Sequence, residues 1–248
     1  MGHVFSYNDA VAYEQWQSSE AQRSLIQLQN RLMADMLRPL PGESVLDVGC
    51  GPGRTLDFLI SYGLQGTGID PSPHMIDICR NRVRNRADLH IGTAEDLPFD
   101  DNAFHYALIN NSLEFVAHPR KSLEEACRVT KNRLFIGFLN RLAMKSISVN
   151  TEGWEVDAVY QHAHFFTLWE VKEMLTCILG DVPVTWRTAS FFPAAMGGFT
   201  RHLERFRLLQ RFPFGMFIGM MVEPVPRFRT RPLSMDLSHA QTPGPVAG

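Results

Sequence analysis

The sequence predicts an α/β fold in which helices cover both faces of a mostly parallel sheet. Two observations support this prediction. Apolar segments of strand length alternate with amphipathic segments of helix length between residues 44 and 140, and alternating glycines follow the first apolar segment. The alternation is typical of parallel sheets, because parallel strands need a crossover that is usually a helix. A chain of 248 residues is long enough for one such domain with additions and too short for two full-sized domains with a linker.

The overall composition is that of an ordinary globular protein. Hydrophobic residues make up 45% and charged residues 20% of the chain, and the net charge of −2 gives no general attraction to nucleic acid or membranes. No apolar run approaches the roughly 18 residues that span a bilayer, and the first residues lack a secretory signal. The cysteines form no CxxC pair, so we expect buried thiols, no metal site and a cytoplasmic location. They are Cys50, Cys79, Cys127 and Cys177.

Each element of the first half follows from its local pattern. Residues 9–37 have apolar side chains at helical spacing and no glycine or proline, which predicts one long helix or two short ones. Strand patterns follow at 44–49, 66–70, 88–92, 103–110 and 132–140. Helical patterns lie between them at 54–62, 74–85 and 119–130.

The regular alternation ends near residue 140. Residues 141–164 have weak periodicity. We expect a helix at 168–179, a strand at 183–192, a basic helix at 198–212 and a last strand at 215–223. From Pro224 onward Pro, Arg, Ser and Gly accumulate without periodicity, which is typical of a disordered tail.

The stretch "VLDVGCGPGR" at residues 45–54 predicts a nucleotide site at a strand-to-helix turn. Glycines allow backbone N–H groups to approach a ligand closely, because no Cβ intervenes. The stretch lacks the Gly-Lys-Ser/Thr of a phosphate-binding P-loop and has G-x-G-x-G in place of the dinucleotide pattern G-x-G-x-x-G. Asp47 would repel a pyrophosphate and suits an ammonium group. Asp70 ends the next strand, where it either accepts ribose hydroxyls or caps a helix.

Four motifs resemble the class I S-adenosylmethionine-dependent methyltransferases, and the branch that includes the ubiquinone and menaquinone C-methyltransferases is most similar. The motifs are "VLDVGCGPGR", "GIDPSPHM", "GTAEDLPFDDNAFHYAL" and "SLEEACRVT", which occur in the order and at the spacing of the family over about residues 40–140. The resemblance implies a Rossmann-like fold with a seven-stranded, mostly parallel sheet whose last strand is antiparallel. It also implies S-adenosylmethionine as the cofactor.

The resemblance assigns roles to individual residues. Glycines 49, 51 and 53 would wrap the methionine end of the cofactor, Asp70 would hold its ribose, and "GTAED" would lie along its adenine. In "FSYNDAVAYEQW" Tyr13 would be a lid residue, unless this segment is only an amphipathic helix with aromatic anchors. The expected cofactor-binding set is Asp47, Gly49, Cys50, Gly51, Gly53, Asp70, Pro71, Met75, Thr93, Ala94, Glu95, Asn110 and Tyr13.

The sequence departs from the family pattern at two places. Thr93 stands where relatives often have Asp, so Thr93, Glu95 or Asp96 is the candidate for the adenine amino group. The usual Pro-Gly-Gly before the fifth strand is missing from "RVTKNRLF", which predicts a tighter turn. With these assignments the chain divides into a helical cover at 1–38, the cofactor-binding core at 39–140, the rest of the core with acceptor-binding insertions at 141–223, and the disordered tail at 224–248.

Methyl transfer from a sulfonium needs an aligned acceptor more than a catalytic side chain. If a base is needed, His162 and His164 in "YQHAHFF" are weak candidates, because a surface or structural role accounts better for both. A metal site would lack a third ligand nearby. We expect a small or lipid-like acceptor and no nucleic acid. A non-catalytic binding protein on the same fold is the alternative. The arginines at 199–212 form either a solvated surface or a roof that meets an amphiphilic acceptor or a membrane surface.

Overall fold

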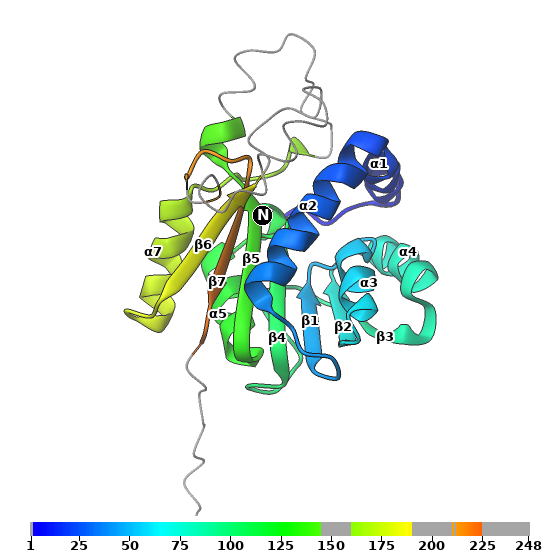
Figure 1. Cartoon of the computed structure of the whole chain (residues 1–248). Helices are drawn as coiled ribbons and strands as arrows, with labels where there is room; N and C mark the ends of the chain where they lie inside the picture. The colour runs from blue at the N-terminus through cyan, green and yellow to red at the C-terminus, as the bar shows by residue number, and fades with distance from the viewer. Residues whose placement is uncertain (1, 145–159, 190–209, 211, 225–248) are drawn as a thin grey trace, which may run out of the picture.

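A single seven-stranded sheet forms the centre of the molecule (Figure 1). The computed structural model describes residues 2–144, 160–189, 210 and 212–224. The strands run in the order β3-β2-β1-β4-β5-β7-β6, and β7 is antiparallel to both of its neighbours while the other paired strands are parallel. The predicted fold class is confirmed. The strands are β1 (Ser44–Val48), β2 (Gln65–Asp70), β3 (Ala87–Ile91), β4 (Phe104–Asn110), β5 (Thr130–Leu139), β6 (Val184–Ala189) and β7 (Phe217–Val222).

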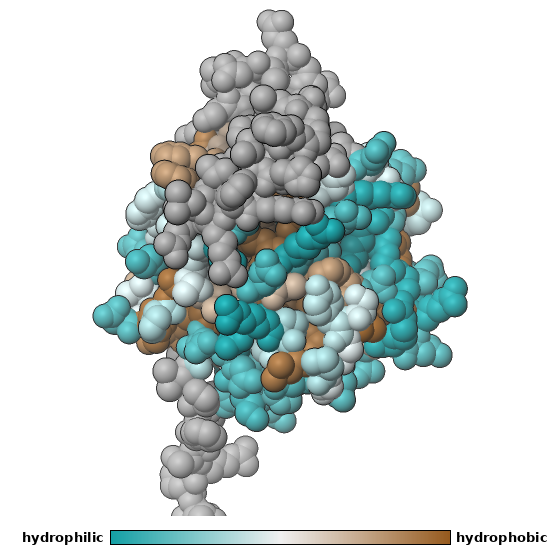
Figure 2. All heavy atoms as spheres, viewed as in Figure 1, coloured by the Kyte–Doolittle hydropathy of each residue, from teal (hydrophilic) through white to brown (hydrophobic). Residues whose placement is uncertain are grey.

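Helices cover both faces of this sheet. Helices α2, α3 and α4 pack on one face, and α5 and α7 pack on the other, where the largest apolar cluster lies. Figure 2 shows hydrophilic residues over α1 and α4 on the face in view. The helices are α1 (Tyr7–Ser18), α2 (Glu20–Leu37), α3 (Arg54–Ser61), α4 (Pro73–Val83), α5 (Pro119–Val129) and α7 (Leu168–Leu179), with short 3-10 turns η1 (Arg84–Arg86) and η2 (Leu113–Phe115).

The N-terminal helical region is two helices with different surroundings. Ser19 ends α1 and caps α2, because its side chain accepts the backbone N–H of Gln22. Helix α2 packs on the sheet through Met33 and Leu37, which are fully buried against β4, β5 and β7. Helix α1 instead lies against α2 and α4 near the carboxyl ends of the strands (Figure 1). Helix α1 therefore lies where it can cover a site at that end of the sheet.

The turn between α5 and β5 has no connecting loop. Thr130 is both the residue that ends α5 and the first residue of β5, and its hydroxyl donates to the carbonyl of Ala126 at 2.6 Å. A buried hydroxyl needs such a partner. This direct connection is the tighter turn that the missing Pro-Gly-Gly predicts.

The cysteine prediction is wrong at one position. Cys50, Cys79 and Cys127 are buried, but Cys177 is exposed on α7. Helix α7 turns Val171 and Leu175 toward the sheet, and position 177 is two residues further along, which places it on the outward side. No helix in the described part of the chain is long and apolar enough to cross a membrane. The predicted basic helix, apart from its last residues, and the predicted tail lie outside the described residues.

Candidate cofactor site

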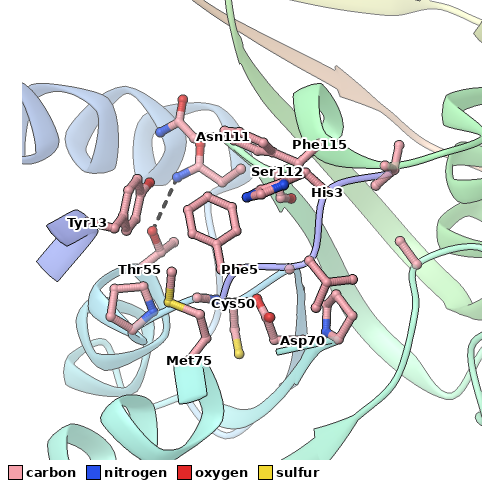
Figure 3. Close-up of a pocket in the computed structure, with 18 of the residues that line it drawn as sticks. His3, Phe5, Tyr13, Cys50, Thr55, Asp70, Met75, Asn111, Ser112 and Phe115 are labelled. Carbon is pink, nitrogen blue, oxygen red and sulfur yellow. Dashed lines mark hydrogen bonds between the residues drawn. The ribbon is translucent and has the colours of Figure 1, made fainter. Parts of the chain in front are cut away.

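A cavity of about 240 Å³ opens at the carboxyl ends of β1, β2 and β4 (Figure 3). In open α/β sheets this end of the strands is where ligands bind. Its lining comes from the glycine turn after β1, the end of β2, the segment after β3 and the segment after β4. Helices α1 and α2 and the extended residues 2–5 add to it from the N-terminal side. Segments far apart in sequence thus meet around one space.

The three glycines of the turn have different surroundings. All three have positive φ angles, of 72° at Gly49, 50° at Gly51 and 79° at Gly53. A Cβ at Gly49 would lie 2.4 Å from the Cβ of Ser112, and one at Gly53 would lie 2.4 Å from the Sγ of Cys79. At Gly51 a Cβ would meet no atom within 4 Å. Gly49 and Gly51 line the cavity and Gly53 does not, so Gly53 serves the packing of α3 on α4.

Asp70 connects the end of β2 to the glycine turn. One carboxylate oxygen accepts the backbone N–H of Gly51 and the other accepts that of Ser72, both at 2.9 Å. Burial raises the pKa of Asp70, and the two hydrogen bonds act against this rise. The side chain is among those that line the cavity (Figure 3). Each carboxylate oxygen has a second lone pair, so the group retains acceptor capacity toward a ligand.

Asp47 lies in β1, two residues before the turn, and is 1% exposed. Burial raises the pKa of its carboxyl group to about 8, and the negative charge of Asp70 adds to this effect. One of its oxygens has no hydrogen-bond partner among the described residues. Asp47 is not among the residues that line the cavity.

The segment before α1 forms one wall of the cavity. The backbone N–H of His3 donates to the carbonyl of Phe115 at 2.8 Å, and the hydroxyl of Ser72 donates to the carbonyl of Phe5 at 2.6 Å. The Phe5 ring meets the rings of Tyr13 and Phe115 edge-on, at centroid distances of 5.5 and 5.1 Å (Figure 3). Sequence reasoning named Tyr13 and did not name residues 2–5, although Phe5 begins the motif "FSYNDAVAYEQW".

The segment after β3 also reaches the cavity. Thr93, Ala94 and Glu95 are in the lining, and Asp96 is not. The Glu95 carboxylate is already engaged, because one of its oxygens accepts the backbone N–H groups of Ala117 and His118 at 2.9 and 3.1 Å. Of the two candidates for the adenine amino group that line the cavity, Thr93 and Glu95, only Glu95 is engaged in this way.

Several amide side chains also line the cavity. The Nδ2 group of Asn110 donates to the hydroxyl of Thr55 at 3.2 Å, and that of Asn111 donates to Oε1 of Gln29 at 3.0 Å. Asn111 has a φ of 53°, a conformation that Asn tolerates better than most residues. The Oδ1 atoms of both asparagines and Oε1 of Gln17 have no partner in the described part of the chain. Sequence reasoning missed Gln17 and Gln29, since nothing in their local pattern distinguishes them from other polar helix residues.

The structure does not place the two candidate histidines in the lining. His162 and His164 are exposed. The ring of His162 stacks on that of His3 at 4.4 Å, and the backbone N–H of His164 donates to the carbonyl of Glu114. Among the described histidines only His3 lines the cavity, and its Nε2 lies 3.5 Å from a carboxylate oxygen of Asp9. The described residues contain no cluster of three possible metal ligands.

Glu114 is a second buried carboxyl group that sequence reasoning missed. It is 2% exposed, and burial raises its pKa to about 7. One of its oxygens accepts the backbone N–H of Leu139 at 2.8 Å, and the other has no partner among the described residues. Its neighbours Ser112 and Phe115 line the cavity, but Glu114 does not.

The sheet order, the glycine turn and the acid at the end of β2 are together the features of class I S-adenosylmethionine-dependent methyltransferases. Residues 46–136 match the family model described as "Methyltransferase domain". The resemblance found in the sequence is therefore confirmed over residues 46–136.

Individual relatives agree with this class. A demethylmenaquinone methyltransferase of Renibacterium salmoninarum is 38% identical over 101 residues, which are 41% of this chain and 42% of that protein. Among solved structures, a Thermotoga maritima S-adenosylmethionine-dependent methyltransferase described as a possible histamine N-methyltransferase has a TM-score of 0.67 and 22% identity, covering 88% of this chain and 97% of that chain. Geranyl diphosphate C-methyltransferase from Streptomyces coelicolor has a TM-score of 0.58 and 17% identity, covering 82% and 81%. The first curated relatives are matched over 39% to 64% of their own lengths.

Proposed function

We propose that this protein transfers the methyl group of S-adenosylmethionine to a small or lipid-like acceptor. One observation supports this proposal most directly. A carboxylate oxygen of Asp70 accepts the backbone N–H of Gly51 at 2.9 Å at one end of a cavity formed by the strand ends, and the space beside the Cα of Gly51 is open. A ligand with a hydroxylated ribose and a group that approaches bare backbone fits such a site.

The remaining cofactor contacts follow from the lining. Asp70 would accept the ribose hydroxyls with its free lone pairs, and the Thr93–Glu95 segment would lie along the adenine. The backbone at Gly49 and Gly51 would approach the methionine part. The buried carboxyl group of Asp47 suits a nearby ammonium group, which would stabilise the ionised form of this carboxyl and lower its pKa. Tyr13 and Phe5 would close the site from the N-terminal side.

The bound cofactor supplies a methyl group on a sulfonium sulfur. The thioether that leaves when the methyl group is transferred needs no further activation. The contribution of the chain is then to hold the acceptor in line and to exclude water. Where the acceptor is a phenol or an activated carbon, a proton must also be removed, and His3 is the histidine that the cavity wall offers for this.

The residues that line the cavity support a small, lipid-like acceptor. Apolar side chains of Phe5, Ile26, Phe115 and Val116 line it together with uncharged amides. This mixture suits an amphiphilic small molecule better than a nucleic acid, for which the net charge of −2 is also unfavourable. The names of the two relatives that act on demethylmenaquinone and geranyl diphosphate are consistent with a lipid-like acceptor. We also propose a cytoplasmic location, because free thiols persist in a reducing compartment.

The proposal is tested by supplying the purified protein with S-adenosylmethionine carrying a labelled methyl group and with polar and lipid extracts. The expected result is a labelled product in one extract, with a mass gain of one methylene group. The matched control is Asp70→Ala, which should label that product far more slowly. Tight S-adenosylmethionine binding without any labelled product would favour a non-catalytic binding protein, and no binding at all would overturn the proposal.

A further inference from the structure

Glu14 of α1 forms ion pairs with two arginines that flank the glycine turn. Its Oε1 atom lies 2.7 Å from Nη2 of Arg54, the first residue of α3, and 2.6 Å from Nη2 of Arg82 in α4. Both pairs are hydrogen-bonded. A single carboxylate oxygen thus connects three helices, and Glu14 is 40 and 68 residues away from its partners in the sequence.

The two arginines also bind the turn and the helix directly. Arg82 donates through Nη1 to the carbonyl of Pro52, which lies inside the glycine turn. Arg54 donates through Nη2 to the hydroxyl of Ser18, one turn along α1 from Glu14. The position of α1 and the shape of the glycine turn are therefore fixed by the same group of side chains.

The cluster is largely shielded from solvent. The exposed fractions of the side chains are 27% for Glu14, 21% for Arg54 and 20% for Arg82. Two guanidinium groups at this depth repel each other, and burial together with the charge of Arg82 lowers the pKa of Arg54. Glu14 supplies the compensating negative charge. Removal of that charge leaves two buried cations beside the turn, which is costly.

Arg54 connects this cluster to the cavity. It is among the lining residues, and its Nε atom is buried without a partner in the described part of the chain. The guanidinium group of Arg54 places a positive charge beside the cavity, which suits an anionic ligand group such as a carboxylate.

We propose that Glu14 is a positioning residue of the cofactor site: it holds Arg54 in the cavity wall and joins α1 to the glycine turn, so that cofactor binding and the closure of α1 are coupled. This inference rests on the proposed function, because it requires that S-adenosylmethionine occupies the cavity. It assigns the acid of the "YEQW" segment a role toward the cofactor, while Tyr13 and Trp16 supply aromatic packing.

The test compares Glu14→Gln with wild type and with Asp57→Asn. Asp57 forms a similar ion pair with Arg86 at 2.7 Å, between α3 and η1, but this pair does not reach α1. Two quantities are measured: the Kd of S-adenosylhomocysteine by calorimetry, and the hydrogen exchange of α1 amides with and without this ligand. For Glu14→Gln we expect a Kd at least about fivefold higher, the lower range of coupling between sites, and loss of the ligand-induced protection of α1. Asp57→Asn should retain both properties.

Two results would overturn the inference. One is a folded Glu14→Gln protein with wild-type Kd and wild-type protection of α1; the other is equal weakening in Asp57→Asn, which would indicate a general loss of stability. If Glu14→Gln does not fold, Ser18→Ala removes the hydrogen bond from Arg54, together with the one that the Ser18 hydroxyl donates to the carbonyl of Glu14 at 2.8 Å, and should still reduce the protection of α1. Unchanged protection in that variant also contradicts the inference. Failure of the wild-type protein to bind S-adenosylhomocysteine would overturn the proposed function itself.

Discussion

The carboxylate of Asp70 accepts the backbone N–H of Gly51 at 2.9 Å, and so joins the end of β2 to the turn that follows β1. The other oxygen accepts the N–H of Ser72. The acid therefore shapes the turn in addition to facing the cavity. Replacing it affects both the fold and the ligand, and the two effects must be separated.

For Asp70→Ala we expect at least about tenfold weaker binding of S-adenosylhomocysteine, since each lost hydrogen bond to a charged acceptor is worth roughly 1.5–3 kcal/mol. The backbone N–H groups of Gly51 and Ser72 also lose their acceptor, which should cost about 1–3 kcal/mol of stability. Asp70→Asn keeps one acceptor oxygen and should lose less of both. Calorimetry gives the affinity and urea unfolding gives the stability. An Asp70→Ala protein that folds and binds normally would remove this assignment.

Substitutions at Gly51 and Gly53 should have different effects, on cofactor binding and on stability respectively. In Gly51→Ala the new methyl group meets no protein atom, so the cost to folding is only the left-handed backbone, about 1–2 kcal/mol. The same methyl group enters the cavity and should weaken cofactor binding strongly. In Gly53→Ala the Cβ would lie 2.4 Å from the sulfur of Cys79, so overpacking adds about 1–3 kcal/mol to the backbone cost.

Thermal unfolding and ligand calorimetry on the two glycine variants test this division. Gly53→Ala should have the lower Tm, and the added change Cys79→Ala should restore part of the loss, because it removes the clashing sulfur. Equal Tm values for the two single variants would contradict the difference in packing.

The wall formed by residues 2–5 should slow the release of the ligand. Deleting these residues leaves the Ser6–Asp9 capping box of α1 intact and removes the Phe5 ring. Burial of such a ring is worth about 1.5–3 kcal/mol, so we expect dissociation of S-adenosylhomocysteine to be about tenfold faster, as measured by stopped-flow tryptophan fluorescence. Tyr7→Ala is the matched control, since Tyr7 is 64% exposed. Unchanged dissociation after the deletion would mean that these residues only pack.

Two buried carboxyl groups should make the free protein less stable as pH rises. Burial raises the pKa of Asp47 from 3.8 to about 8 and that of Glu114 from 4.5 to about 7. The folded state therefore holds more protons than the unfolded state between these values. The stabilising effect is full below the unfolded pKa values and is lost as pH rises toward 7 and 8, with a slope of up to about 1.4 kcal/mol per pH unit for each group.

Urea unfolding between pH 5 and pH 8 tests this dependence. Asp47→Asn should reduce the slope relative to wild type, because the amide does not titrate. Asp57→Asn, which changes an exposed carboxylate, should leave the slope as it is. A slope that Asp47→Asn does not change would show that this group is ionised in the folded protein.

Most of the fold was predictable because its signals are local. The central strands β1 and β4 are short apolar runs, and the helices between the parallel strands show a clear period. The glycine turn is equally local, since the alternation of glycines leaves few other structures for residues 49–53. No local pattern indicates that β7 is antiparallel to its neighbours in the sheet. That expectation came only from the resemblance to the methyltransferase family.

The site residues that the sequence did not predict share a common physical reason for being missed. Residues 2–5 line the cavity because the chain returns across the strand ends, and their hydrogen bonds use backbone groups that any residue provides. The cluster of Glu14, Arg54 and Arg82 brings together residues from three helices, and each alone resembles a solvated surface charge. The exposure of Cys177 depended on how α7 is rotated about its axis, where the pattern of apolar residues left some freedom.

The last described strand has a consequence for the synthesis of the protein. Although β7 is made after β6, it lies between β5 and β6 and pairs with both. Before residues 217–222 leave the ribosome, β5 has an unpaired edge and β6 has no partner in this sheet. Open apolar edges of this kind invite aggregation. A nascent chain therefore exposes this open edge until nearly all of its described residues have been translated, and a chain truncated before Phe217 should be cleared by proteases rather than accumulate.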